Sequence, residues 1–151
     1  MNKNPARTLL VLSALVMALV VSPAAVSYPN GIQGVKDSGC NCHGAVTSSE
    51  VVPSITGLPD QYNYSETYEI TVSFVGGPSD PSNINQGGFN LWVSDGELTP
   101  SDATVQSYSV NEVSHTEAGN DQTSWTLTWT SPSSDRNVEF VLHTNSVNGN
   151  A

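Results

Sequence analysis

The chain is poor in basic residues and in cysteine. Its 151 residues include four Lys and Arg against 14 Asp and Glu, and only two cysteines. Two of the basic residues precede residue 28, so residues 28–151 hold two basic and 14 acidic side chains, a net charge of −12. Phosphate backbones and anionic membrane surfaces repel such a chain. The charge balance therefore argues against nucleic acid as a partner.

Catalytic sequence motifs are also missing. The chain has no Gly-x-Ser-x-Gly, no His-Glu-x-x-His and no Walker loop. Ser114, His115 and Glu117 are close in sequence, but residues of these types are common in polar turns. We therefore expect a protein that is not an enzyme.

Only one apolar run exceeds the length of a strand, at residues 9–21. It is too short for a membrane span, which needs about 20 residues. Lys3 and Arg7 precede it, and small residues at 25 and 27 follow it, as in a secretory signal peptide cleaved before Tyr28. The alternative is an uncleaved anchor helix. We expect export to the medium or the cell surface, with no membrane span in the mature chain.

The remaining chain shows short segments with a period of two residues, separated by Gly, Pro, Ser and Asn. The segments are 52–58, 67–75, 88–94, 104–113, 124–130 and 138–143, and Pro53 and Gly57 make the first of them an edge strand. This spacing predicts an all-β fold, an antiparallel immunoglobulin-like β-sandwich of about seven strands. The expected shared core is Phe74, Phe89, Leu91, Trp125, Leu127 and Phe140.

Both cysteines lie in the stretch Gly-Cys-Asn-Cys-His-Gly, as Cys40 and Cys42 followed by His43. Covalent haem c needs two thiols and an adjacent imidazole, at a usual spacing of C-x-x-C-H, one residue longer than here. His115 and His143 are candidates for its second axial ligand. Two thiolates and an imidazole also suit zinc or copper. The third alternative is a strained Cys-x-Cys disulfide or a bond to another chain.

Three segments in this order resemble a known family. They are Gly-Gly-Phe-Asn-Leu at 87–91, Trp-Thr-Leu-Thr-Trp at 125–129 followed by Ser-Pro, and Asn-Ser-Val-Asn-Gly at 145–149. Over about residues 30–151 the chain resembles secreted reelin-like (Reeler-type) domains, also called choice-of-anchor V domains. The resemblance implies an exported or surface-anchored β-sandwich with C-x-x-C-H near its start. It also implies that 87–91 and 125–129 are core strands and that 145–149 precedes a final strand.

These observations predict three parts: a signal helix at 1–27, an irregular, exposed Cys-His arm at 28–50, and a β-sandwich at 51–151 that lacks its last strand or its anchor. The expected function is that of an exported or cell-surface structural or interaction domain with an extracellular protein or surface partner. The alternative is a haem c electron carrier, or a metal-binding module, that uses Cys40, Cys42 and His43.

Overall fold

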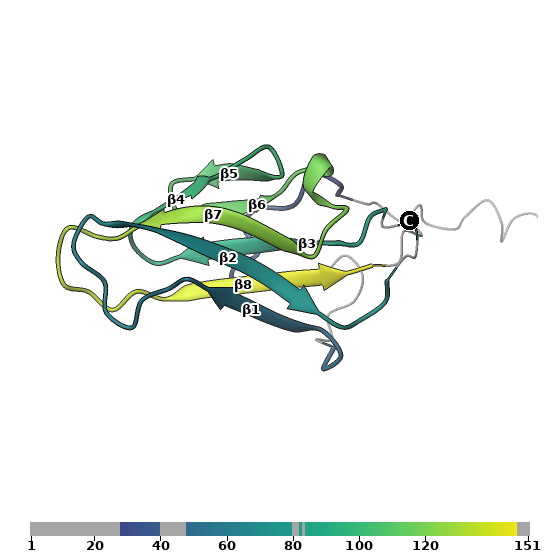
Figure 1. Cartoon of the computed structure of the whole chain (residues 1–151), viewed down its shortest axis with the longest axis horizontal. Coiled ribbons are helices and arrows are strands. Elements are labelled where there is room, and N and C mark those ends of the chain that lie inside the picture. The colour runs from purple at the N-terminus through teal and green to yellow at the C-terminus, as the bar shows by residue number, and fades with distance from the viewer. Residues whose placement is uncertain (1–27, 40–47, 80–81, 83, 148–151) are drawn as a thin grey trace, which may run out of the picture.

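The computed structural model describes residues 28–39, 48–79, 82 and 84–147 (Figure 1). They form eight strands and one 3-10 turn, which confirms the all-β prediction and adds one strand to the expected number. In chain order these are β1 (Val52–Thr56), β2 (Thr67–Val75), β3 (Gly87–Val93), β4 (Glu97–Pro100), β5 (Val105–Ser109), β6 (Glu112–His115), η1 (Glu117–Gly119), β7 (Ser124–Thr130) and β8 (Phe140–Ser146). Within these residues we find no helix with the length and apolar character of a membrane span.

The strands form two four-stranded antiparallel sheets packed face to face. Sheet A has the order β1-β2-β7-β4, and sheet B has the order β5-β6-β3-β8. β1 and β8 lie along one side of the sandwich, while β4 and β5 lie along the other (Figure 1). Each sheet therefore contributes one edge strand to each side.

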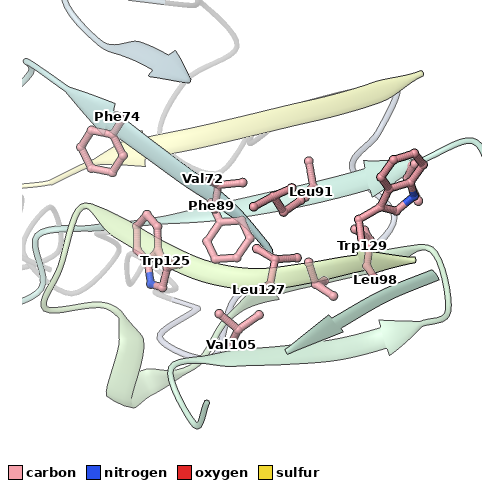
Figure 2. Packing of buried hydrophobic residues seen from close by; sticks show 12 residues of the cluster. Val72, Phe74, Phe89, Leu91, Leu98, Val105, Trp125, Leu127 and Trp129 are labelled. Carbon is pink, nitrogen blue, oxygen red and sulfur yellow. The ribbon is translucent and has the colours of Figure 1, made fainter. Parts of the chain in front are cut away.

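Alternation of side chains places the core between the sheets. In β7, Trp125, Leu127 and Trp129 are buried, whereas the serine and threonines between them lie on the outer face. Every second side chain of a strand points to the same face, so the apolar residues of β7 all face the core and its hydroxyl-bearing residues all face outward. Figure 2 shows the two tryptophans at opposite ends of one row of buried side chains. The expected core is confirmed, although Phe140 is only partly buried. The fully packed members are Ile70, Val72, Phe74, Phe89, Leu91, Val93, Leu98, Val105, Val113, Trp125, Leu127 and Trp129.

The segment 104–113 is not the single strand that its pattern predicts. It forms β5 and β6, which pair with each other across a turn at Val110 and Asn111. Val110 is 66% exposed, and the hydroxyl of Ser109 donates to the side chain of Asn111 across 2.7 Å. The turn contains neither Gly nor Pro, so valine at 110 extends the apparent alternation through it. For this reason the sequence pattern hides the reversal.

Smaller differences concern strand limits. β4 was not among the expected strands, because four residues ending in proline are too few to show alternation. The last strand begins at Phe140 instead of residue 138 and continues to Ser146. β1 ends at Thr56, since Gly57 has a φ of +88°, and it is the edge strand that was expected. β3 begins and ends one residue earlier than predicted.

Candidate functional site

Cys40, Cys42 and His43 lie outside the described residues, but the segment that leads to them does not. Residues 28–39, here called the strap, contain turns and bends without helix or strand, so the expected irregular structure is confirmed for this part. The expected exposure is wrong in part, because Gly31 is buried and Val35 is only 6% exposed. The strap lies on the outer face of sheet B, as its hydrogen bonds show.

The first half of the strap is bound through Asn30. Its backbone oxygen accepts hydrogen bonds from the hydroxyl of Tyr108, at 2.9 Å, and from the side-chain amide of Gln106. Its side-chain oxygen accepts from the backbone N–H of Glu117 at 3.0 Å. These bonds connect the strap to β5 and to the 3-10 turn. Asn30 therefore holds the strap at one end of sheet B.

The middle of the strap is bound by a buried asparagine of β3. Asn90 is fully buried, and its amide nitrogen donates to the backbone oxygen of Ile32, at 2.8 Å, and to Glu112, at 2.9 Å. The same Glu112 oxygen accepts from the backbone N–H of Gly34 at 2.7 Å. Buried polar groups that are hydrogen-bonded in this way fix one arrangement of the chain. The strap is consequently an integral layer of the fold.

The last residues of the strap reach β8. The ammonium of Lys36 lies 4.7 Å from the ring centroid of Trp92, a cation–π contact. The backbone oxygen of Lys36 is 3.0 Å from Nε2 of His143. A carbonyl oxygen can only accept, so Nε2 carries the hydrogen of this bond.

The other ring nitrogen of His143, Nδ1, lies near the end of the strap. Nδ1 lies 3.5 Å from the point that a Cβ on Gly39 would occupy. Gly39 immediately precedes Cys40 in the sequence. Of the two histidines that were candidate axial ligands, His143 is therefore the one whose ring lies beside the residue that precedes Cys40.

His115 is unsuited to the same role. Its Nδ1 accepts a hydrogen bond from the backbone N–H of Phe89 at 3.1 Å. Its ring packs 6.4 Å from the ring centroids of both Phe89 and Trp125. Burial lowers the pKa of His115, although hydrogen bonding to the backbone at Phe89, whose carbonyl oxygen lies 3.2 Å from Nδ1, and at Tyr28 acts in the opposite direction. The ring is thus partly buried against the core.

The lowered pKa of His115 predicts a stability that depends on pH. In the unfolded chain the imidazole gains a proton as the pH falls through about 6.5, while the folded chain resists protonation until a lower pH. The free energy of unfolding should therefore have its full value above about pH 6.5 and should decrease as the pH is lowered from about 6.5 to 5.5. Urea unfolding at these two pH values measures the change. His115→Asn, which keeps an acceptor but does not titrate, should remove most of it; an unchanged slope would show that another group is responsible.

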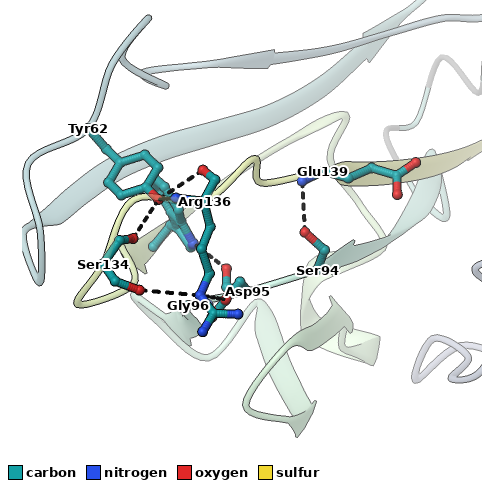
Figure 3. Close-up of polar contacts among 8 residues, drawn as sticks. Tyr62, Ser94, Asp95, Gly96, Ser134, Arg136 and Glu139 are labelled. Atoms are coloured by element: carbon teal, nitrogen blue, oxygen red, sulfur yellow. Dashed lines mark hydrogen bonds and ion pairs between the residues drawn. The ribbon is translucent and has the colours of Figure 1, made fainter.

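A second polar cluster joins three loops at the other end of β8 (Figure 3). The hydroxyl of Tyr62 lies within 3.0 Å of the backbone oxygens of Ser134 and Arg136 and accepts from the backbone N–H of Arg136. Arg136 forms an ion pair of 3.2 Å with Asp95. These contacts bind loop backbone to side chains, so the cluster has a structural role. No group of three or more His, Cys, Asp or Glu that could hold a metal occurs within the described ranges.

Comparisons with known proteins give matches among solved structures. No protein-family model and no curated protein matches the chain. The crystal structure of the reelin-N domain of F-spondin is similar at 21% identity and a TM-score of 0.45, covering 66% of this chain and 73% of that one. A crystal structure of the human F-spondin reeler domain is similar at 20% identity and a TM-score of 0.41, covering 66% and 76%. Both of these solved structures are reelin-type domains.

Proposed function

We propose that this protein is an exported β-sandwich that acts by binding an extracellular protein or surface partner, not by catalysis. One observation carries the proposal: several polar side chains that could serve in a catalytic site are engaged in holding the fold. His115 packs, partly buried, beside Phe89 and Trp125, and Asn90, through its amide nitrogen, and Glu112 bind the strap. Tyr62 and Arg136 hold loops together. Groups occupied in this way are poor catalysts, whereas the outer face of sheet A, which carries exposed residues such as Glu69 and Ser124, remains accessible to a partner.

Export is supported by the first 27 residues and by the charge of the rest. The apolar run with basic residues before it and small residues after it is the pattern of a signal peptide. The net charge of −12 beyond it favours solubility in a salt-rich medium, where such charge is screened. In this proposal the mature chain begins at Tyr28, the first residue of the strap.

A second candidate function uses Cys40, Cys42 and His43 to bind haem or a thiolate-preferring metal such as zinc or copper. The observation that favours it is the orientation of His143. Its Nε2–H is held by a backbone oxygen, as is common for metal-binding imidazoles, and its Nδ1 lies near Gly39. Cys40 follows Gly39 in the sequence, so the proposal combines two thiolates and two imidazoles in one site. Four such ligands suit zinc or copper(I), while covalent haem would be held by the two thiols and the imidazoles.

Intact-mass measurement of the exported protein tests both candidates. We expect a chain that begins at Tyr28; a chain beginning at Met1 in the cytoplasmic fraction would contradict export. A mass gain of one haem that survives denaturation identifies covalent attachment, whereas a metal seen only under native conditions identifies a metal module. Either adduct should be lost in Cys42→Ser and His43→Ala, and a metal should also be weakened in His143→Ala.

The matched control for these variants is the mutation of the other candidate imidazole, His115→Asn, which should keep the adduct. A mass lower by two hydrogens, with no adduct, would show a Cys40–Cys42 disulfide. That result would exclude the second candidate and leave the binding domain as the function.

A further inference from the structure

The sequence contains one Asn-x-Ser/Thr triplet, Asn63-Tyr64-Ser65. With any residue except proline in the middle, such a triplet is the acceptor for N-linked glycosylation, which attaches a sugar to the side-chain nitrogen of the asparagine. The triplet predicts a modification only where it lies in a surface loop of an exported protein. The surroundings of these three residues therefore decide whether the triplet can be used.

All three residues lie in the loop that connects β1 with β2, directly after Tyr62 of the polar cluster in Figure 3. Each of them is exposed, and Tyr64 is 59% exposed. The acceptor asparagine is thus at the surface, in the kind of loop that the modification requires.

The backbone around the acceptor is held by its neighbours. The N–H of Asn63 donates to the hydroxyl of Tyr68 at 2.7 Å, and its carbonyl oxygen accepts from the hydroxyl of Ser131 at 2.6 Å. The N–H of Ser65 donates to the carbonyl oxygen of Pro132 at 3.0 Å. These bonds use backbone groups of the triplet, whereas a sugar would be linked to the side chain. The linkage therefore leaves the loop intact.

The side-chain nitrogen of Asn63 can carry a sugar and keep its own hydrogen bond. An asparagine amide has two hydrogens on Nδ2. One hydrogen bond of 2.5 Å connects Nδ2 with the carboxylate of Glu66. Glycosylation replaces one hydrogen, and the other remains for Glu66. The contact that positions the side chain is therefore compatible with the modification.

Ser65 is not explained by the fold of the loop. Its φ is +55°, in the left-handed region that favours glycine, asparagine and aspartate. Its hydroxyl has no hydrogen-bond partner among the described residues. Neither the backbone nor the packing of the loop therefore calls for serine at this position, whereas the acceptor triplet requires its hydroxyl.

We propose that Asn63 carries an N-linked oligosaccharide in the exported protein. The donor is a lipid-linked oligosaccharide. A bond forms between Nδ2 and the anomeric carbon of the first sugar, and the bond between that carbon and the lipid phosphate breaks. The phosphate leaves with the electron pair, Nδ2 releases one proton, and nothing is oxidised or reduced. This inference rests on the export that is part of the proposed function.

The test uses the protein purified from the medium or surface of the cells that naturally produce it. Cleavage after acidic residues releases the peptide 61–66, which contains Asn63 and excludes the Cys-His segment, so haem or metal there cannot imitate the result. We expect a mass raised by a whole number of sugar residues, with fragment ions that place the addition on Asn63. An unmodified peptide would overturn the proposal.

Three variants made in the same cells identify the acceptor. Asn63→Gln and Ser65→Gly should both lose the sugar, and the second keeps the acceptor asparagine while it suits the positive φ. The matched control is Asn137→Gln, which changes an exposed asparagine that is not followed by the triplet hydroxyl and should keep the sugar. A sugar that persists in Asn63→Gln or Ser65→Gly would assign the modification to another residue and overturn the proposal.

The N-terminus of the same sample separates this proposal from the proposed function. A chain that begins at Tyr28 and has an unmodified 61–66 peptide would overturn the glycosylation and leave export intact. A chain that begins at Met1 in the cytoplasmic fraction would contradict export, and the glycosylation with it.

Discussion

Trp125→Ala is expected to lower the free energy of unfolding by about 3–5 kcal/mol, enough to unfold most of a small domain. Trp125 is 1% exposed and packs 4.8 Å from the ring of Phe89 and 6.2 Å from that of Phe74. It therefore connects β7 of sheet A with β3 of sheet B. Alanine would leave a large cavity between the sheets and would leave the backbone oxygen of Gly119 without the indole N–H that now donates to it at 2.7 Å. Urea unfolding followed by circular dichroism measures the loss.

Trp92→Ala is the matched control, because it makes the same substitution on the other face of sheet B. Trp92 is partly exposed and contacts Lys36 of the strap. We expect a loss of about 1 kcal/mol, from the cation–π contact and some packing against the strap. Losses of similar size in the two variants would contradict the assignment of Trp125 to the core and Trp92 to the strap interface.

The sequence predicted the fold best where a strand has one buried and one exposed face. In β2 and β7 the alternation is complete, and both strands have the predicted limits. The prediction failed at the turn between β5 and β6. Val110 lies in this turn, but it continues the alternation of apolar residues, so the pattern does not show that the chain reverses. It also failed at β4, whose place is determined by pairing with β7 and not by its own four residues.

The candidate site was less predictable, because its organisation depends on contacts between distant positions. His115 and His143 are equivalent as sequence candidates, and only the fold packs the first against the core and places the second near Gly39. The strap looked like an exposed arm, since its polar residues gave no sign that Asn90 and Glu112 bind its backbone. A buried asparagine in a strand that is otherwise apolar was the one available signal. Cys40, Cys42 and His43 stay a prediction.

Gly88→Ala is expected to cost about 1–3 kcal/mol, although a single methyl group is added. Gly88 lies in β3, and a Cβ there would be 2.2 Å from Cε1 and 2.5 Å from Nδ1 of the His115 ring. Its backbone does not adopt a positive φ, so the cost arises from space and not from backbone strain. The ring cannot easily move away, because it packs beside Phe89 and Trp125 and is hydrogen-bonded to the backbone.

The variant His115→Ala isolates this contact in a double-mutant cycle. Without the imidazole ring, the Cβ of alanine at position 88 no longer meets residue 115. In this background Gly88→Ala should be neutral or stabilising by a few tenths of a kcal/mol, since glycine loses more entropy on folding than alanine does. The double mutant should therefore be more stable than the sum of the two single losses predicts, by about 1–3 kcal/mol. Urea unfolding of the four proteins measures the coupling. An equal cost of Gly88→Ala in both backgrounds would show that the backbone of β3, and not the imidazole, requires glycine at this position.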